Sequence, residues 1–257
     1  MGLPWRALVV PPSVWPHVHR CCCASAKTHS DDRIENLFEQ CYYDLDGYCE
    51  TAEEAKSINA RFGERASTYG EVSVQGARRI LARLFSSQSR DNTIFLDLGS
   101  GIGKIVALAA LEHGSVVRSI GVELCESRHA RAIVARDRLL AACSGSCSTN
   151  LAQESVDRVR CERIEFRLGD MLEAHQAVAQ CTHVFLSSLL FNEETMRSLA
   201  LLLDGAPHLT TIATLQEFPS DVKWSFVADG TVLARMDWHT GEVDPGIDVF
   251  IYSRQST

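Results

Sequence analysis

The sequence lacks several patterns that define whole classes of protein. No apolar run approaches the ~20 residues needed to cross a bilayer, so we expect no membrane-spanning helix. The ten cysteines form no CxxC pair and the nine histidines form no HExxH motif, so we expect no metal site. Lys and Arg number 25 against 33 Asp and Glu, and the net charge of −8 argues against nucleic-acid binding by the whole surface.

The first 27 residues contain no acidic residue, as in organelle-targeting peptides. Four prolines would interrupt the amphipathic helix that such a peptide needs: Pro4, Pro11, Pro12 and Pro16. We interpret residues 1–29 as a disordered or variable extension, with a targeting segment as the alternative. Residues 30–90 are expected to form a helical part, and residues 91–257 a core that ends in antiparallel strands.

A glycine-rich turn at residues 95–104, FLDLGSGIGK, is the most informative stretch. An apolar run ends at Asp97, glycines follow at Gly99, Gly101 and Gly103, and a helical apolar pattern begins after Lys104. Glycines at such a turn permit positive φ angles and close approach of a ligand. The turn also presents free N–H groups at a helix N-terminus, which predicts a nucleotide-like cofactor on a Rossmann-type sheet.

Two further strand tips carry acids. Glu123 ends a second apolar run, where a carboxylate can accept from both hydroxyls of a ribose, and Asp170 follows a third run. The GSGIG string places its third glycine one residue earlier than the GxGxxG of NAD enzymes. With both acids, it is typical of class I S-adenosylmethionine methyltransferases. A dehydrogenase and a Rossmann-like domain that has lost its ligand are the alternatives.

Strands alternating with helices predict an α/β fold with a mostly parallel, doubly wound, Rossmann-like sheet and a small helical N-terminal part. Thr51 and Glu54 form a capping-box pattern, residues 143–155 are expected to form a loop, and Trp238 and Tyr252 are interpreted as core. Beyond residue 218 we expect short strands separated by Asp-Gly and Pro-Gly turns. The expected strands lie near 93–97, 118–123, 162–168, 182–187 and 207–214, and the expected helices near 31–43, 51–62, 72–84, 103–113, 125–142, 171–179 and 193–203.

Two segments outside the glycine turn are more specific. A Tyr69-Gly70-Glu71 loop precedes the first strand, and a block that ends in Phe191 follows the fourth. With the glycine turn, Glu123 and Asp170, they resemble the disruptor-of-telomeric-silencing family, the Dot-type, non-SET histone lysine N-methyltransferases, over roughly residues 60–215. Where that family usually has two asparagines and an aromatic, this chain has Ser187, Ser188 and Leu189.

The resemblance implies a role for each site residue, with S-adenosyl-L-methionine as cofactor. Glu123 would hold the ribose, Asp170 the adenine amine, and Glu71 the α-amino group of the cofactor. The expected catalytic set, which would line a lysine channel, is Tyr69, Ser187 and Phe191, and the remaining cofactor contacts are Asp97, Gly99, Ser100, Gly101, Gly103, Lys104 and Met171. For Lys104 two interpretations stay open, a contact with the cofactor carboxylate and a solvated position at the start of the helix. Tyr69 and Ser187 would also touch the cofactor.

The implied activity is methylation of a lysine on a nucleosomal core histone, histone three by resemblance, in the nucleus. One alternative is lysine methylation of a non-histone protein, which the acid-poor N-terminus would allow to be mitochondrial. Another is a silent cofactor-binding homologue, which the Ser187-Ser188 replacement favours slightly. Residues 218–257 contain few basic residues, so no strong DNA-binding segment is expected.

Overall fold

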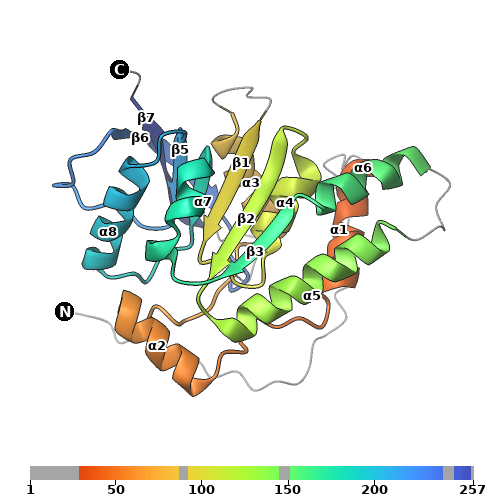
Figure 1. Ribbon diagram of the computed structural model, residues 1–257, viewed down its shortest axis with the longest axis horizontal. Helices are drawn as coiled ribbons and strands as arrows, with labels where there is room; N and C mark the ends of the chain where they lie inside the picture. The colour runs from red at the N-terminus through yellow and green to blue at the C-terminus, as the bar shows by residue number, and fades with distance from the viewer. Residues whose placement is uncertain (1–28, 87–91, 145–150, 240–245, 256–257) are drawn as a thin grey trace.

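The computed structural model describes residues 29–86, 92–144, 151–239 and 246–255. Within them, seven strands form one sheet in the order β3-β2-β1-β4-β5-β7-β6 (Figure 1). The first five strands pair in parallel, and β7 runs antiparallel to both of its neighbours. The strands are β1 (Thr93–Leu98), β2 (Val116–Glu123), β3 (Ile164–Leu168), β4 (His183–Leu186), β5 (Thr211–Thr214), β6 (Phe226–Ala234) and β7 (Ile247–Arg254).

Helices cover both faces of the sheet, which confirms the doubly wound arrangement. Neighbouring strand residues point to opposite faces, so Phe95 joins one apolar core and Leu96 the other. One core is completed by α1 (His29–Tyr42), α3 (Val74–Leu84), α4 (Lys104–Glu112) and α5 (Glu126–Ala142). The other is completed by α2 (Ala52–Phe62), α7 (His175–Gln180) and α8 (Glu193–Asp204) (Figure 1).

The prediction of a loop over residues 143–155 is partly wrong. Helix α6 (Leu151–Cys161) begins inside it, whereas residues 145–150 lie outside the described part of the chain. The small polar residues of this stretch hide the helix from sequence patterns, and tertiary contacts stabilise it instead. Cys161 is fully buried, and Asp157 forms an ion pair with Arg33 of α1.

The Asp229-Gly230 pair does not form the predicted turn between two strands. It lies inside the single strand β6, at an irregularity in the pairing with β7 between Ala228 and Thr231. Gly230 adopts a φ of 90°, and Ser253 on β7 donates a hydrogen bond of 2.7 Å to Asp229. The extra residues are therefore absorbed as a bulge, and the strand continues.

Other boundaries differ in smaller ways. The predicted helix over 171–179 is a 3₁₀ turn, η1 (Met171–Glu173), followed by α7, and β5 begins at Thr211 instead of residue 207. The Thr51–Glu54 capping box is present at the start of α2. The predicted extension over residues 1–29 lies outside the described residues except for His29, the first residue of α1. The proline of the predicted Pro-Gly turn, Pro245, also lies outside them.

Candidate active site

Three cavities open at the carboxyl ends of the parallel strands. The first, here the strand-tip cavity, has about 590 Å³ of empty space and is lined by Gly99, Gly101, Glu123, Gly169 and Met171 among others. The second, the glycine-turn cavity, has about 370 Å³ and is lined by Glu71, Asp97, Ser100, Gly101 and Lys104 among others. The third, the outer cavity, has about 1320 Å³, partly open to solvent, and is lined by Tyr48, Leu189, Leu215, Met236 and Trp238 among others.

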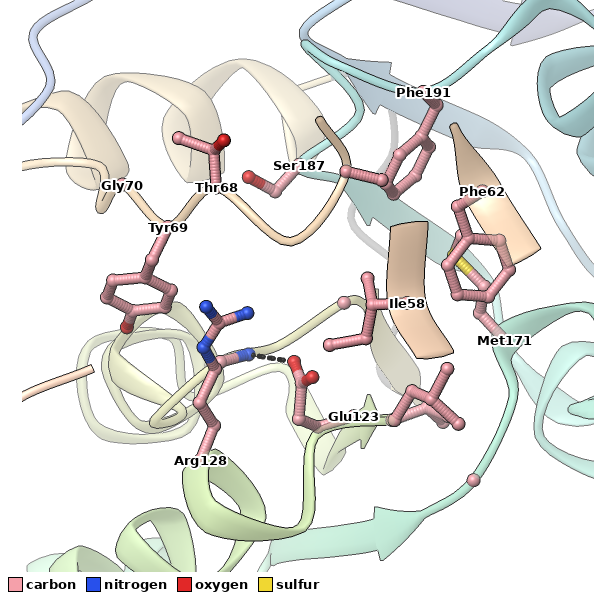
Figure 2. Close-up of a pocket in the computed structure, with 16 residues that line it drawn as sticks. Ile58, Phe62, Thr68, Tyr69, Gly70, Glu123, Arg128, Met171, Ser187 and Phe191 are labelled. Carbon is pink, nitrogen blue, oxygen red and sulfur yellow. Dashed lines mark hydrogen bonds between the residues drawn. The ribbon is translucent and has the colours of Figure 1, made fainter. Parts of the chain in front are cut away.

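All three cavities share the same three residues. Tyr69, Gly70 and Ser187 line each of them, so the cavities meet at the Tyr-Gly-Glu loop and the tip of β4. Figure 2 shows Tyr69, Arg128 and Glu123 toward one side of the strand-tip cavity, and Phe62, Met171 and Phe191 toward the other. The sequence-predicted catalytic set is thus gathered at one place, although Phe191 lines only the strand-tip and outer cavities.

The glycines of the turn serve different purposes. All three have positive φ angles, and a Cβ added at Gly99 would meet no atom within 4 Å, so Gly99 opens onto free space. A Cβ at Gly101 would lie 2.8 Å from the Tyr69 ring, and one at Gly103 would lie 2.2 Å from the Phe166 ring. Gly103 lines none of the three cavities and is required for packing instead.

Glu123 ends β2 with its carboxylate already oriented. One oxygen accepts a hydrogen bond of 2.7 Å from the Gly101 amide, and the other accepts one of 2.8 Å from the Cys125 amide. Burial raises the pKa of Glu123, while these amides and the nearby Arg128 charge act in the opposite direction. Each oxygen keeps a lone pair for a ligand hydroxyl, because an ionised carboxylate offers about four acceptor sites.

Asp97 ends β1 and has an unsatisfied oxygen. Its Oδ1 is buried without a hydrogen-bond partner, and the residue is only 3% exposed. Burial raises the pKa of Asp97 well above its usual range, and the charge of Glu123 adds to the effect. A buried acid without a partner is stabilised by a cation, so the geometry favours a positively charged group in the glycine-turn cavity.

Glu71 and Lys104 pair directly with each other at the same cavity. Glu71 accepts hydrogen bonds from the Tyr69 hydroxyl and from Lys104 Nζ, with which it forms an ion pair. The structure therefore places a carboxylate and an ammonium beside Asp97, a combination that can bind the two charged ends of an amino acid. The buried hydroxyl of Ser100 has no partner in this cavity either.

Asp170 differs from the other predicted cofactor contacts, because it lines none of the three cavities. Its Oδ1 accepts from the Leu172 amide at 2.7 Å, where it caps η1, and its Oδ2 accepts from Arg61 Nε at 2.6 Å. Both oxygens are thus engaged, and the neighbouring Met171 is the residue that reaches the cavity.

Ser187 and Ser188 have separate surroundings. Ser187 lies where the cavities meet, whereas Ser188 is fully buried. The Ser188 hydroxyl bonds the Thr214 hydroxyl at 2.6 Å and accepts from the Gln216 amide at 3.1 Å. Ser188 therefore ties the tip of β4 to the end of β5.

Several residues that line the cavities were not predicted from the sequence. Arg128 is the third residue of α5 and is 5% exposed beside Glu123 and Tyr69. A cation in the first turn of a helix opposes the helix dipole, and this mismatch is a signal that could have identified it. Ile58 and Phe62 of α2 line the same cavity, and their four-residue spacing on an otherwise polar helix is a second signal.

Trp238 corrects another expectation, since it is 44% exposed on the outer cavity and not in the core. A Cβ added at Gly70 would lie 2.1 Å from its ring, so the indole packs directly on the Tyr-Gly-Glu loop. The Val72–Met236 bridge brings these distant segments together, and no local pattern encodes it. Tyr252, by contrast, is buried as expected.

Within the described ranges, no group of three or more His, Cys, Asp or Glu side chains is arranged to hold a metal ion. Among the same residues, no helix is both long enough and apolar enough to span a membrane.

The strand order with its antiparallel β7, the glycine turn and the acid at the tip of β2 define a class I S-adenosylmethionine-dependent methyltransferase. A family model described as "Histone methylation protein DOT1" matches residues 51–243, and the chain belongs to this family. S-adenosylmethionine is its cofactor.

Comparison with solved structures gives distant likenesses. The methyltransferase domain of bacterial CtHen1 is 13% identical, with 72% of this chain and 100% of that one covered and a TM-score of 0.49. Magnesium protoporphyrin IX methyltransferase from Synechocystis PCC 6803 is 12% identical, with 90% and 100% covered and a TM-score of 0.48. An O-methyltransferase from Bacillus cereus is 15% identical, with 87% and 97% covered and a TM-score of 0.46. No curated protein sequence matches the chain.

The residues present fit this cofactor. The unpartnered Asp97 oxygen is suited to a cationic group, and the pre-oriented Glu123 carboxylate is suited to a ribose diol. A Cβ added at Gly99 or at Gly169 would meet no atom within 4 Å, so both glycines leave room for a ligand.

Proposed function

We propose that the chain is a protein-lysine N-methyltransferase that modifies a nucleosomal core histone, histone three by its family resemblance, in the nucleus. The observation that carries the proposal is the junction of three cavities at Tyr69, Gly70 and Ser187. In this proposal the strand-tip cavity binds the adenosyl moiety of the cofactor and the glycine-turn cavity binds its amino-acid moiety. The outer cavity leads from the junction to solvent. A long side chain can therefore reach the cofactor from outside.

We assign the cofactor contacts from the chemistry of each cavity. Glu123 would hold the ribose hydroxyls, with Met171, Ile58 and Phe62 against the base. Asp97 and Lys104 would meet the ammonium and the carboxylate. Glu71, which the sequence predicted to hold the ammonium, pairs with Lys104 and accepts from Tyr69, so we assign it the role of keeping Lys104 in place. When bound, S-adenosylmethionine supplies a methyl group that its sulfonium already activates.

Asp170 has a revised role in this proposal. Because Asp170 lines none of the three cavities and its oxygens accept from Arg61 and the Leu172 amide, we propose that Asp170 holds α2 over the cavity and that the backbone beside Gly169 and Met171 meets the adenine edge. Figure 1 shows α2 below the end of the sheet at which these strand tips lie.

The outer cavity has the character of a lysine channel. Its walls include Leu189, Leu190, Phe191, Leu215 and Trp238, and Leu189 is 42% exposed at its rim. An apolar wall strips water from an incoming ammonium, which lowers the pKa of the amine and favours the neutral nucleophile. The channel therefore contributes to the reaction by desolvation and by alignment.

Tyr69 is assigned a positioning and lining role in this channel, without proton abstraction. Burial and the neighbouring Glu71 charge raise the pKa of Tyr69 well above its usual range, and its hydroxyl already donates to Glu71. The phenol therefore stays protonated. We assign no general base, and the proton of the amine leaves to solvent through the outer cavity.

Methyl transfer from labelled S-adenosylmethionine tests the proposal directly. The substrates are nucleosomes, free core histones and a mitochondrial extract, each with the wild type and with Glu123→Ala. Glu126→Ala is the matched control, because Glu126 is an exposed acid three residues further on that lines no cavity. We expect label on a core-histone band that Glu123→Ala abolishes and Glu126→Ala retains, and mass spectrometry would identify the lysine.

Two results would contradict this assignment. Label confined to the mitochondrial extract would make the substrate a non-histone protein. Binding of S-adenosylmethionine without label in any substrate would make the chain a silent homologue.

A further inference from the structure

Arg128 makes an unusual set of contacts for a residue at the start of a helix. Its Nε donates to the Gly47 carbonyl at 3.0 Å, and its Nη2 donates to the Ser67 carbonyl at 2.8 Å. Nη2 also lies 2.9 Å from a carboxylate oxygen of Glu50, in an ion pair. One guanidinium thus joins α5 to the loop after α1 and to the segment before Tyr69.

The same guanidinium stacks on Tyr69, with its carbon 4.5 Å from the ring centroid. Two glycines leave space for the ring on its other sides. A Cβ added at Gly47 would lie 1.9 Å from the ring, and one at Gly101 would lie 2.8 Å from it. The Tyr69 ring is therefore confined by Arg128, Gly47 and Gly101, and its hydroxyl is fixed by Glu71.

These contacts link the two sides of the reaction. Arg128 lines the strand-tip cavity beside Glu123. The segments that it holds carry Tyr48, which lines the outer cavity, and Thr68 and Tyr69, which line both the strand-tip and the outer cavity. A Lys at this position would keep the positive charge near Glu123. It could not donate to two carbonyls and stack on a ring at once, because an ammonium is a point charge without the planar fork.

We propose that Arg128 is a positioning residue that sets the wall of the substrate channel by clamping Tyr69. The inference rests on the proposed lysine methyltransferase function and concerns a residue outside its catalytic set. The inference separates two contributions of the Arg128 side chain. Its positive charge acts on Glu123 at the cofactor cavity, whereas its planar guanidinium, through hydrogen bonds and stacking, holds Tyr69 at the substrate channel.

Arg128→Lys and Gly47→Ala test the clamp from opposite sides of the ring. Gly47 does not have a positive φ and lines none of the three cavities, so alanine is compatible with the backbone and acts by displacing Tyr69. Arg136→Lys is the matched control on the same helix, since Arg136 pairs only with its neighbour Asp137 among the contacts described.

We expect Arg128→Lys to raise KM for the histone substrate about tenfold or more, since small misplacements of substrate-positioning groups have effects of this order. The dissociation constant for S-adenosylhomocysteine should change less than about threefold, because the charge beside Glu123 is kept. Gly47→Ala should likewise raise KM for the histone substrate and leave the dissociation constant for S-adenosylhomocysteine nearly unchanged. KM of the double variant should be no higher than that of the more strongly affected single variant. Residues that act through one ring are not additive.

Hydrogen–deuterium exchange of the free protein gives a readout that does not require turnover. Both variants should lose protection in residues 66–70, and Arg136→Lys should not. If the wild type methylates no histone but this loss is seen, the clamp stands and the histone assignment fails. Unchanged KM and unchanged protection in both variants would overturn the clamp, as would an equal loss of affinity for cofactor and substrate in Arg128→Lys.

Discussion

Replacing Asp97 with Asn should stabilise the free protein while weakening cofactor binding. Asp97 has a buried oxygen without a hydrogen-bond partner and lies beside another buried acid, Glu123. An unsatisfied buried polar group costs about 1–3 kcal/mol, and a charge costs more. Asn has nearly the same shape and carries no charge. Asn leaves an unpaired amide at this position, so the substitution removes only the cost of the charge or of proton uptake. We therefore expect the free energy of unfolding of the ligand-free chain to rise by about 1 kcal/mol near neutral pH, roughly the equivalent of one pKa unit.

The sign of the pH dependence follows from the raised pKa of Asp97. The folded state holds the proton more tightly than the unfolded state, in which an Asp pKa is about 3.9. The contribution of Asp97 to stability is therefore fully present below about pH 4 and is lost as pH rises through the folded pKa. The advantage of Asp97→Asn should be greatest in mild alkali and should shrink toward about pH 4.

The affinity for the cofactor should fall in Asp97→Asn, whereas the stability of the free protein should rise. A hydrogen bond between an ammonium and a carboxylate contributes about 1.5–3 kcal/mol, and Asn cannot supply the charge. The affinity for S-adenosylhomocysteine should fall at least about tenfold, the equivalent of 1.4 kcal/mol.

Thermal unfolding with and without ligand, and calorimetric titration, measure both effects. Asp157→Asn is a suitable contrast, because Asp157 is also buried but is paired with Arg33. Its free energy of unfolding should fall or stay unchanged. The melting temperature of Asp97→Asn should rise by about 2–4 °C per kcal/mol for a chain of this size. A variant less stable than the wild type, or one that binds the ligand equally well, would refute the account of Asp97.

Three other predictions concern the surroundings of the cavities. Burial raises the pKa of Glu54, but its hydrogen bonds outweigh that effect and lower the pKa to about 2. The free energy of unfolding of Glu54→Gln should therefore be about 1–2 kcal/mol lower than that of the wild type near neutral pH, after allowance for solvent screening. Urea titrations should show this difference disappearing as pH falls from about 4.5 toward 2. Gly70→Ala places a Cβ 2.1 Å from the Trp238 ring, which is exposed enough to move, so steady-state kinetics should show KM for the protein substrate rising several-fold with little change in melting temperature. Arg61→Ala breaks the contact with Asp170 that holds α2 over the strand-tip cavity, and stopped-flow measurements should show faster release of S-adenosylhomocysteine; unchanged release would remove α2 as a barrier.

The positions of the glycine turn and of the acids at the strand ends could be predicted because their signals are local in sequence. The glycines, Asp97 and Glu123 occur where a parallel strand ends, and topology alone brings the ends of β1, β2 and β4 together. Asp170 shows the limit of this reasoning. Its position at the third tip is as expected, but its partner Arg61 lies 109 residues away in sequence.

The residues that the sequence could not reveal depend on contacts between distant segments. Trp238 reaches the site through the bridge between Val72 and Met236, and α6 is held by burial of Cys161 although its neighbouring sequence resembles a loop. Arg128 is recognisable only when its carbonyl partners on two other segments are known. These contacts are specified by packing, for which periodicity and turn signals contain no information.

The paired replacement of the family's asparagines by serines separates into two effects of different kinds. Ser188 is fully buried, and its hydroxyl already bonds Thr214 and Gln216, so this position serves the junction of β4 and β5. Ser187 alone faces the three cavities. A hydroxyl reaches less far than an amide and offers one donor where an amide offers two. The two serine replacements therefore alter the chemistry that faces the cavities at a single position, Ser187. The third replacement, Leu189 for the family's aromatic, lies in the wall of the outer cavity, so the two departures that reach a cavity are Ser187 and Leu189.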